Sequence, residues 1–236
     1  MKNLEPAYAV IIPALDPPES LLALVKELRT AADPLVVVVN DGSSPEYTAV
    51  FEDLQKAGAA VLHHQCNYGK GRALKTAFAH LLQNYPELRG AVVADADGQH
   101  AVGDMIRCLN MLAEYPHDLI IGCRELAAEH VPWKSKLGNR VCCKLFSLLY
   151  GIKLQDTQCG LRGIPADFMP VLLELPGERY EFESFMLREA ARGLPGGGRL
   201  RSMPIQTLYG KGNRSSHLRI FRDSAEIIAA ILQKYK

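Results

Sequence analysis

Five short, largely apolar segments recur along the first half of this sequence, and they constrain the fold more than any other feature. Runs of this length with almost no polar side chains are typical of parallel strands that helices cover on both faces. Between them, apolar residues follow helical spacing, as at Leu21, Val25 and Leu28. The alternation predicts an α/β fold with an open, mostly parallel sheet. The expected strands are 8–12, 35–39, 59–62, 91–94 and 118–121.

The second half of the sequence is less regular, but it continues without a break in composition. No Ser/Gly-rich or strongly charged linker divides the 236 residues, so a single domain, 1–236, is expected. Gly196–Gly198 is interpreted as a loop between a helix and a strand. The other expected elements are helices around 134–150 and 181–191, a strand near 200–208 and a final helix from about 220.

Charge and composition exclude several classes of protein. The chain has 27 Lys and Arg against 26 Asp and Glu, a net charge of +1, which argues against nucleic-acid binding. Its first residues lack the basic-then-apolar order of a signal peptide, and no apolar stretch reaches the ~18 residues of a membrane span. The six cysteines lack paired C-x-x-C spacing and are expected to be reduced. A cytoplasmic protein is predicted.

Asp95, Asp97 and Gln99 follow the apolar run 90–94 at alternating positions, so an extended backbone would point all three the same way. In open parallel sheets, ligands bind beyond the carboxyl ends of the strands. Mg2+ prefers oxygen ligands and usually takes one or two carboxylates together with substrate phosphates. We predict that Asp97 and Gln99 hold a divalent cation and that Asp95 contacts a ribose, or the metal through water. The alternative is an acidic loop that caps the helix near 103.

Two further loops at the same edge contain residues suited to nucleotide binding. Asp41 follows the second strand, where a carboxylate fits a base or ribose but is also a common helix cap. The segment Asn67–Gly71 places two glycines before a helix, which permits close backbone approach, and Lys70 suits a phosphate. It lacks the spacing of a P-loop, so an ordinary glycine turn with a solvated lysine is an equal alternative.

Basic residues collect after the fifth strand and near the C-terminus. Arg124 follows that strand, and Lys136, Arg140 and Lys144 share one face of the next helix. They suit an anionic head group, although a solvated basic face is the ordinary explanation. The stretch 199–236 holds eight Lys or Arg and two acidic residues, so its helix would suit core packing or an anionic membrane surface.

Seven segments occur in an order that resembles the inverting family 2 glycosyltransferases with a GT-A fold. Among these, the chain is similar to the polyprenyl-phosphate glycosyltransferases, such as the dolichyl-phosphate mannose synthases. The segments are Ile12–Ala14, Val39–Ser43, Asn67–Gly71, Asp95–His100, Gly122–Arg124, Asp156–Gly160 and Tyr180–Glu183. The resemblance covers nearly the whole chain. It implies a nucleotide-sugar-binding half, 1–123, and an acceptor-binding half, 124–236, that ends in a basic helix.

The resemblance also implies roles for individual residues. Asp95 and Asp97 form a D-x-D motif, and Asp97 with Gln99 holds Mg2+ or Mn2+ on the donor diphosphate. Leu15–Pro17 stands where the family commonly has Tyr-Asn-Glu. By the resemblance, Pro13, Asp16 and Asp41 border the nucleotide base, and Arg124 and Arg140 face the acceptor phosphate. Thr157 and Gln158 lie near the sugar or acceptor. From their positions in the sequence, Lys70 is added as a phosphate contact and Lys136 as an acceptor contact.

The predicted reaction moves a sugar from a UDP- or GDP-sugar to a polyprenyl phosphate, with inversion. It would take place at the inner face of the cytoplasmic membrane, on a peripheral protein. A small multi-helix membrane protein is an expected partner. A phosphate acceptor is already anionic, whereas a saccharide hydroxyl needs a general base. Glu181 or Glu183 is the candidate base, although a carboxylate at a helix start also favours the helix dipole.

Two other classes of protein share part of this pattern. A non-catalytic nucleotide-sugar-binding scaffold for a membrane partner would use the same pocket without consuming the donor. A nicotinamide-dependent dehydrogenase also has alternating strands and helices. It is excluded because Pro13–Pro17 follows the first strand where G-x-G-x-x-G would be needed.

Overall fold

The computed structural model describes residues 7–124, 133–206, 228–229 and 232. In this part of the chain, one seven-stranded sheet has the order β3-β2-β1-β4-β6-β5-β7. All neighbouring pairs are parallel except those made by β6, which runs antiparallel to both β4 and β5. The strands are β1 Tyr8–Ala14, β2 Leu35–Asn40, β3 Ala60–His63, β4 Gly90–Val93, β5 Leu119–Arg124, β6 Arg162–Pro165 and β7 Leu200–Ile205.

This architecture confirms the predicted α/β fold with a mostly parallel sheet, and all five strands expected in the first half are present. The sequence did not predict β6, a four-residue strand between β4 and β5. Gly163 permits its insertion, because a Cβ there would lie 2.9 Å from the Sγ of Cys108 and 3.0 Å from the Cβ of Ile120. Both halves of the chain therefore supply strands to one sheet, while their division into donor and acceptor halves stays a prediction.

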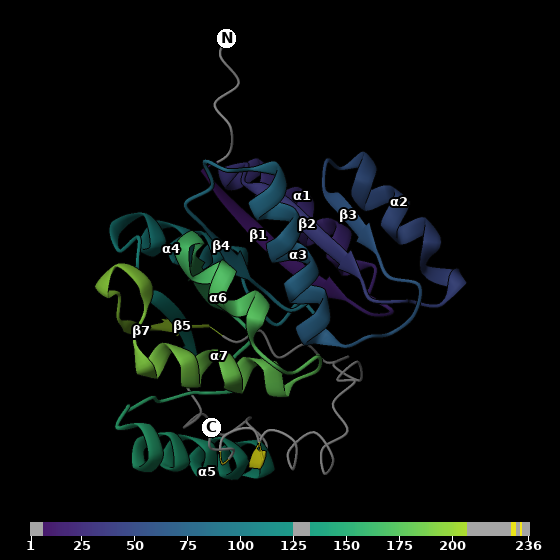
Figure 1. Cartoon of the computed structure of the whole chain (residues 1–236). Helices are drawn as coiled ribbons and strands as arrows, with labels where there is room; N and C mark the ends of the chain where they lie inside the picture. The colour runs from purple at the N-terminus through teal and green to yellow at the C-terminus, as the bar shows by residue number, and fades with distance from the viewer. Residues whose placement is uncertain (1–6, 125–132, 207–227, 230–231, 233–236) are drawn as a thin grey trace.

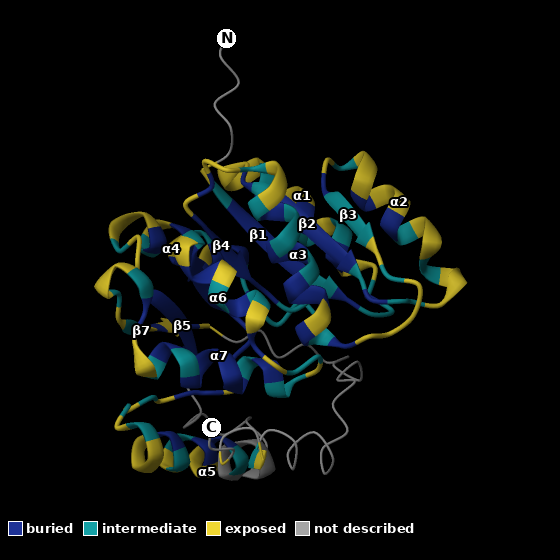
Figure 2. Cartoon of the chain, viewed as in Figure 1, coloured by how far each residue is buried: buried dark blue, intermediate teal, exposed yellow. Residues whose placement is uncertain are grey.

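Helices cover both faces of the sheet (Figure 1). One face packs against α1, α2 and α4, and the other packs against α3, α6 and α7, with α5 packed beyond α7. The strands and inner helix faces are buried, whereas much of α5 is exposed (Figure 2). The helices are α1 Ser20–Ala32, α2 Thr48–Lys56, α3 Lys70–Asn84, α4 Val102–Glu114, α5 Trp133–Tyr150, α6 Met169–Glu174 and α7 Glu181–Arg192. Short 3-10 turns occupy Pro45–Tyr47, Ala166–Phe168 and Pro195–Gly197.

Helix α4 illustrates how apolar spacing places an element. Met105, Leu109 and Leu112 recur at three- and four-residue intervals, and all three are buried against the sheet. Full burial of each such side chain contributes roughly 1.5–3 kcal/mol relative to exposure. The helix ends at Glu114, two residues before Pro116, which cannot continue it. Its first turn follows the Asp95–His100 loop, so packing of the helix also fixes the end of that loop.

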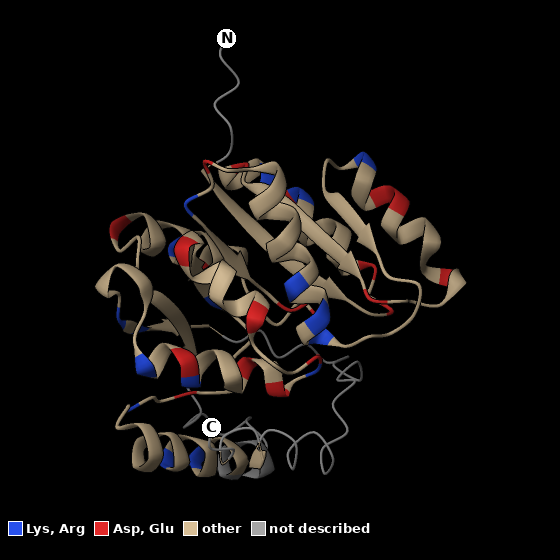
Figure 3. Ribbon diagram, in the orientation of Figure 1, with Lys and Arg blue, Asp and Glu red and all other residues tan. Residues whose placement is uncertain are grey.

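Charged residues lie on the helices and on the loops at the strand ends (Figure 3). The central strands β1, β2 and β4 contain none, because both of their faces are covered by helices. Among the described helices, none combines the length and apolar character needed to cross a bilayer. The predicted C-terminal helix from about 220, and most of the basic stretch that contains it, lies outside the described residues.

Candidate active site

The loops that follow β1 and β2 are tied together by backbone and side-chain hydrogen bonds. The main-chain N of Asp16 donates to Ser43 Oγ at 2.9 Å, and the main-chain N of Ser44 donates to Asp16 Oδ1 at 2.9 Å. Asp16 has a left-handed backbone with φ 46°, which Asp tolerates better than most residues. Pro13 lies within β1, in register with Val39 of β2. Pro13, Asp16 and the β2 loop thus lie at one corner of the sheet edge, where their predicted contact with a base stays a prediction.

Asp41 is buried and serves as an anchor for the loop before α3. Its Oδ1 accepts from the main-chain N of Tyr68 at 3.0 Å and lies 2.7 Å from His64 Nδ1, while Oδ2 accepts from Gly69 N at 2.8 Å. His64 also lies 2.9 Å from the hydroxyl of Thr76 on α3. Asp41 therefore does not act as the helix cap that was considered from the sequence. It instead holds the end of β2 to the start of α3.

The two glycines beside Lys70 allow the first turn of α3 to approach the segment before α7. Gly69 has φ +109°, and a Cβ on it would overlap the carbonyl oxygen of Glu178. A Cβ on Gly71 would lie 2.6 Å from the Cβ of Phe182. Close packing explains both glycines without a phosphate, so the predicted phosphate contact rests on Lys70 alone.

Lys70 bridges two carboxylates from distant parts of the chain. Its Nζ lies 2.7 Å from Asp95 Oδ1 and 3.1 Å from Glu183 Oε2. Burial alone would lower the pKa of Lys70, but the charges of Asp95 and then Glu183 outweigh it and raise the pKa. Burial would likewise raise the pKa of Asp95, yet Lys70 and then His100 hold it well below its usual value. Both groups are therefore charged at neutral pH.

Asp97 differs from Asp95 in its electrostatic environment. Burial and then the neighbouring charge of Asp95 raise the pKa of Asp97. Gln99 donates to both of its oxygens, from Nε2 at 2.7 Å and from the main-chain N at 3.0 Å. Gln99 thus presents its amide nitrogen to Asp97, and it would have to turn its oxygen inward to ligate a metal.

The residues at this loop fit a divalent cation that is shared with a substrate. The carboxylates of Asp95 and Asp97 and the amide oxygen of Gln99 are hard-oxygen donors. A cation would stabilise the ionised form of Asp97, whose pKa is raised by burial and then by the charge of Asp95. Within the described ranges, no group of three or more His, Cys, Asp or Glu has metal-binding geometry. In Mg2+ sites, substrate phosphates commonly complete the ligand set. The roles of Asp97 and Gln99 stay predictions.

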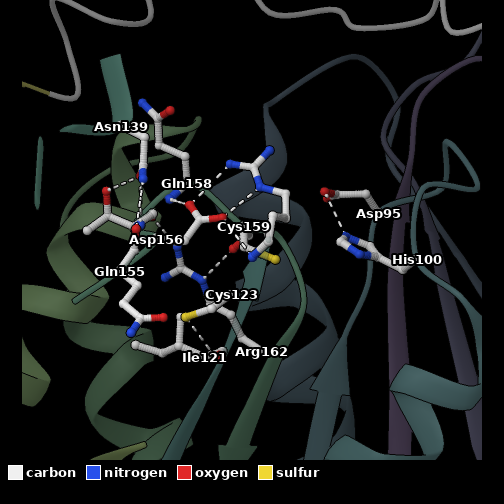
Figure 4. A network of polar contacts seen from close by, with 12 residues as sticks. Asp95, His100, Ile121, Cys123, Asn139, Gln155, Asp156, Gln158, Cys159 and Arg162 are labelled. Atoms are coloured by element: carbon white, nitrogen blue, oxygen red, sulfur yellow. Dashed lines mark hydrogen bonds and ion pairs between the residues drawn. The ribbon is translucent and has the colours of Figure 1, made fainter. Parts of the chain in front are cut away.

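The turn 155–160 touches both ends of the candidate site. A Cβ on Gly160 would overlap the carboxylate of Asp95, so only glycine fits there. Four residues earlier, Asp156 forms an ion pair with Arg124, with Nε 2.7 Å from Oδ2. Figure 4 shows Asp156 and Gln158 next to Asn139, with the Asp95–His100 pair to one side. The turn therefore brings the end of β5 close to the acidic loop after β4.

Thr157 and Gln158, which were predicted to lie near the sugar or acceptor, differ in exposure. Thr157 is buried, and both its main-chain N and its hydroxyl donate to Asn139 Oδ1, at 3.0 and 3.2 Å. Gln158 is exposed. Arg140 follows Asn139 on α5 and is also exposed, while the side chain of Lys136 lies outside those described. The exposed Gln158 and Arg140 are thus better placed to meet a ligand than Thr157.

The two glutamates of α7, Glu181 and Glu183, differ in the groups that they contact. Glu181 Oε1 accepts from the main-chain N of Glu178 at 2.9 Å and of Arg179 at 3.2 Å, so it holds the turn before the helix. Glu183 instead contacts Lys70, and its Oε1 lies 3.5 Å from Nε of the buried Arg162. Of the two proposed bases, only Glu183 points to the site that contains Asp95.

Several residues of this network were not singled out from the sequence. No distinctive spacing marks Asp156, Asn139 or Arg162, because each acts on a partner far along the chain or on backbone atoms, while His100 contacts the nearby Asp95. Arg162 donates to the carbonyl oxygens of Thr157 at 3.2 Å and Glu183 at 2.9 Å. The sequence signal that could have identified Asp156 and His100 was their position within the motifs Asp156–Gly160 and Asp95–His100.

Comparison with known proteins places this arrangement in a family. The family model described as Glycosyl transferase family 2 matches residues 9–170, and the chain belongs to this family. An uncharacterized protein of Methanocaldococcus jannaschii is 26% identical over 230 residues, which cover 95% of this chain and 91% of the relative. The UDP-N-acetylglucosamine–dolichyl-phosphate N-acetylglucosaminyltransferase of Methanococcus voltae is 26% identical over 218 residues, covering 85% of each chain.

Two further comparisons agree with this placement. The undecaprenyl-phosphate mannosyltransferase of Micrococcus luteus is 28% identical over 210 residues, covering 83% of this chain and 81% of the relative. The glucosyl-3-phosphoglycerate synthase of Mycobacterium tuberculosis, solved with Mn2+, UDP-glucose and phosphoglyceric acid, superposes with a TM-score of 0.69 at 16% identity. That superposition covers 96% of this chain and 79% of the solved one. The protein is thus a glycosyltransferase with a GT-A fold.

Proposed function

We propose that this chain transfers a sugar from a nucleotide-sugar to a polyprenyl phosphate, with inversion at the anomeric carbon. The observation that carries the proposal is the turn 155–160, which joins an acidic loop suited to a metal–diphosphate to an arginine suited to a phosphate. Two relatives whose names include dolichyl-phosphate and undecaprenyl-phosphate support the choice of acceptor. The acceptor phosphate is an anion near neutral pH, so its oxygen can attack without a strong general base.

The described residues divide the work of this reaction. A divalent cation held by Asp97 and Gln99 would neutralise charge on the leaving nucleotide diphosphate. Lys70, which pairs with Asp95 in the free protein, is near enough to that loop to contact the same phosphates. Arg124 and Arg140 would orient the acceptor phosphate for in-line attack. Mg2+ and Mn2+ both suit the oxygen donors, and the structure solved with Mn2+ supports use of a divalent metal.

Partners and location follow from the same proposal. A polyprenyl phosphate resides in a membrane, so the protein would work at the inner face of the cytoplasmic membrane as a peripheral protein. The basic C-terminal stretch 199–236 would favour an anionic surface, and a small multi-helix membrane protein would suit as a partner.

The test is transfer of radiolabelled sugar to a polyprenyl phosphate in detergent or vesicles. Purified protein is incubated with UDP- and GDP-sugars, with Mg2+, Mn2+ or EDTA, and label in the organic phase is counted. We expect label with one donor class and a divalent metal, and none in EDTA. Nucleotide-sugar binding without any donor consumption would instead support a scaffold.

A saccharide hydroxyl acceptor remains the alternative reaction, and Glu183 distinguishes it. A hydroxyl must lose its proton, and Glu183 is the carboxylate that faces the site. Glu183→Gln should therefore abolish transfer to a hydroxyl at all pH values. For a phosphate acceptor, no general base takes part in the reaction. The same change should then lower the rate without altering the shape of the pH profile of the rate between about pH 6 and 9.

A further inference from the structure

Asp156 is a buried carboxylate that forms an ion pair with Arg124. The side chain of Asp156 is fully buried, while that of Arg124 is 18% exposed. Nε of Arg124 lies 2.7 Å from Oδ2, and Nη2 lies 3.1 Å from Oδ1. This is the bidentate geometry that fixes a guanidinium plane in direction as well as position.

Backbone contacts hold the carboxylate of Asp156 in turn. The main-chain N of Arg124 donates to Oδ2 at 3.3 Å, and the main-chain N of Gln158 donates to Oδ1 at 3.0 Å. Each oxygen thus accepts two hydrogen bonds, so the carboxylate has little freedom to move. A buried carboxylate that is fixed by the backbone can fix the arginine that it binds.

The same turn is attached to the helix that carries Arg140. Asn139 is 2% exposed, and its Nδ2 donates to the carbonyl oxygen of Gln155 at 3.0 Å. Its Oδ1 accepts from the main-chain N of Thr157 at 3.0 Å. Asn139 therefore joins α5 to the turn immediately before the exposed Arg140, as the contacts in Figure 4 show.

We propose that Asp156 is a positioning residue that acts through Arg124, and that Asn139 fixes the Arg140 helix to the same turn. The turn 155–158 then sets the distance at which two guanidinium groups meet one acceptor phosphate. This inference rests on the proposed function, because it assumes that both arginines bind the acceptor. The inference goes beyond that function by naming Asp156 and Asn139 as the residues that hold the two arginines in place.

A positioning role and a charge-balancing role predict opposite effects of Asp156→Asn. The change removes a negative charge next to Arg124. If Asp156 merely balanced charge, the site would become more positive and the KM for an anionic acceptor would fall. If Asp156 positions Arg124, the guanidinium loses its fixed orientation and the acceptor KM rises.

The experiment measures steady-state kinetics with polyprenyl phosphate and the nucleotide-sugar for wild type, Asp156→Asn, Arg124→Ala and the double variant. We expect Asp156→Asn to raise the acceptor KM about tenfold while the donor KM changes less than about twofold. The double variant should be no worse than Arg124→Ala alone, because the two residues act as one unit. An unchanged or lowered acceptor KM, or additive losses in the double variant, would overturn the proposal.

A matched control separates positioning from stability. Asp118, just before β5, forms a similar ion pair with Arg201, with Nε 2.8 Å and Nη2 2.7 Å from Oδ2, at the opposite end of the strand. Asp118→Asn should lower the melting temperature and leave the acceptor KM unchanged. A rise of the acceptor KM in Asp118→Asn equal to that in Asp156→Asn would show a merely structural effect and reject the inference.

Two further variants keep the test decisive if Asp156→Asn does not fold. Asp156→Glu keeps the charge but moves it by one methylene, and Asn139→Ala removes the link to α5. Both should raise the acceptor KM by roughly threefold or more with the donor KM unchanged. Wild-type protein that transfers no sugar to a polyprenyl phosphate would reject the proposed function itself. Wild-type transfer with unchanged acceptor KM in all variants would reject only this inference.

Discussion

The predicted donor end and acceptor end of this sheet edge are held together in different ways. At the donor end, formed by the loops after β1, β2 and β4, Asp16 and Asp41 accept hydrogen bonds mainly from main-chain N–H groups, and Asp95 pairs with Lys70. At the acceptor end, formed by Arg124, the turn 155–160 and α5, the ion pair with Asp156 holds the arginine. The donor end thus has several separate anchors, whereas the pair at the acceptor end is lost with either partner. Single substitutions in that pair should therefore have the more selective effects.

The largest expected effect is at the donor end, from loss of the metal ligand. Asp97→Ala should reduce sugar transfer by at least about a hundredfold, because charge on the leaving diphosphate is no longer neutralised. Circular dichroism should show an intact fold, since Asp97 anchors no other element. Asp53→Ala, an exposed carboxylate on α2, is the control and should transfer normally. Near-normal turnover of Asp97→Ala would reject the metal role.

The next effect tests whether the two ends depend on one turn. Gly160→Ala would force a methyl group against the carboxylate of Asp95, so it should weaken donor binding about tenfold and cost about 1–3 kcal/mol of unfolding free energy. Gly103→Ala in α4 meets nothing within 4 Å and should stabilise the protein by ~1 kcal/mol. Calorimetric titration with a nucleotide-sugar measures the donor affinity, and urea unfolding measures the free energy of unfolding. Normal donor affinity in Gly160→Ala would show that the ends are independent.

A smaller effect contrasts the two aspartates in the absence of metal. The pKa of Asp97 is raised in the folded protein, so its stabilising contribution is present below its unfolded pKa near 3.8 and is lost as pH rises through the folded value. The pKa of Asp95 is lowered, so its contribution is present above 3.8 and is lost as pH falls through the folded value.

The two asparagine variants should therefore melt differently at pH 7 in EDTA. Asp97→Asn should raise the melting temperature by a few degrees, and Asp95→Asn should lower it. The Asp97 difference should shrink as the pH is lowered towards 4, whereas the Asp95 difference should persist to about pH 4 and shrink only below it, and thermal melts between pH 7 and 3 would measure both. Equal changes of melting temperature with the same sign in both variants would mean that the ion pair with Lys70 does not make the pKa of Asp95 differ from that of Asp97.

The smallest effect concerns thiol reactivity at the two ends. Cys66, in the donor loop before Tyr68, is exposed, whereas Cys143 on α5 is half-buried, with a pKa that burial raises to about 11. At pH 8 roughly one Cys143 thiol in a thousand is ionised, so iodoacetamide should label Cys66 first. Peptide mass spectrometry at short times checks the order. Earlier labelling of Cys143 would contradict its burial beside Thr157 and Asp156.

The position of the donor-end loops at one sheet edge was predictable from the sequence because its signals are local. Asp16, Asp41 and Asp95 each lie within two residues of the end of a strand whose apolar run is easily recognised, and parallel strands bring their carboxyl ends to one edge. Arg124 could also be singled out from the sequence, because it lies at the carboxyl end of β5. Whether these side chains bind a nucleotide-sugar and an acceptor stays a prediction that the experiments above address.

The rest depended on contacts that no local pattern encodes. Strand β6 has the sequence Arg-Gly-Ile-Pro, which favours a turn, and only its neighbours β4 and β5 make it a strand. Asp156 is 32 residues from Arg124 in sequence, and Glu183 is 113 residues from Lys70. Spacing and periodicity describe residues along one element, so they cannot reveal which distant side chains form pairs.

The position of β6 also determines the order in which the sheet can form. Strands β1 to β4 pair with one another from residues 8–93, but β5 is joined to β4 only through β6, which is made later. A chain emerging from the ribosome can therefore complete the first four strands while β5 has no partner. Closing the sheet requires a long loop from residue 124 to residue 162, which is a slow step. We expect the edge of β4 to be exposed during synthesis until residues 162–165 have left the ribosome.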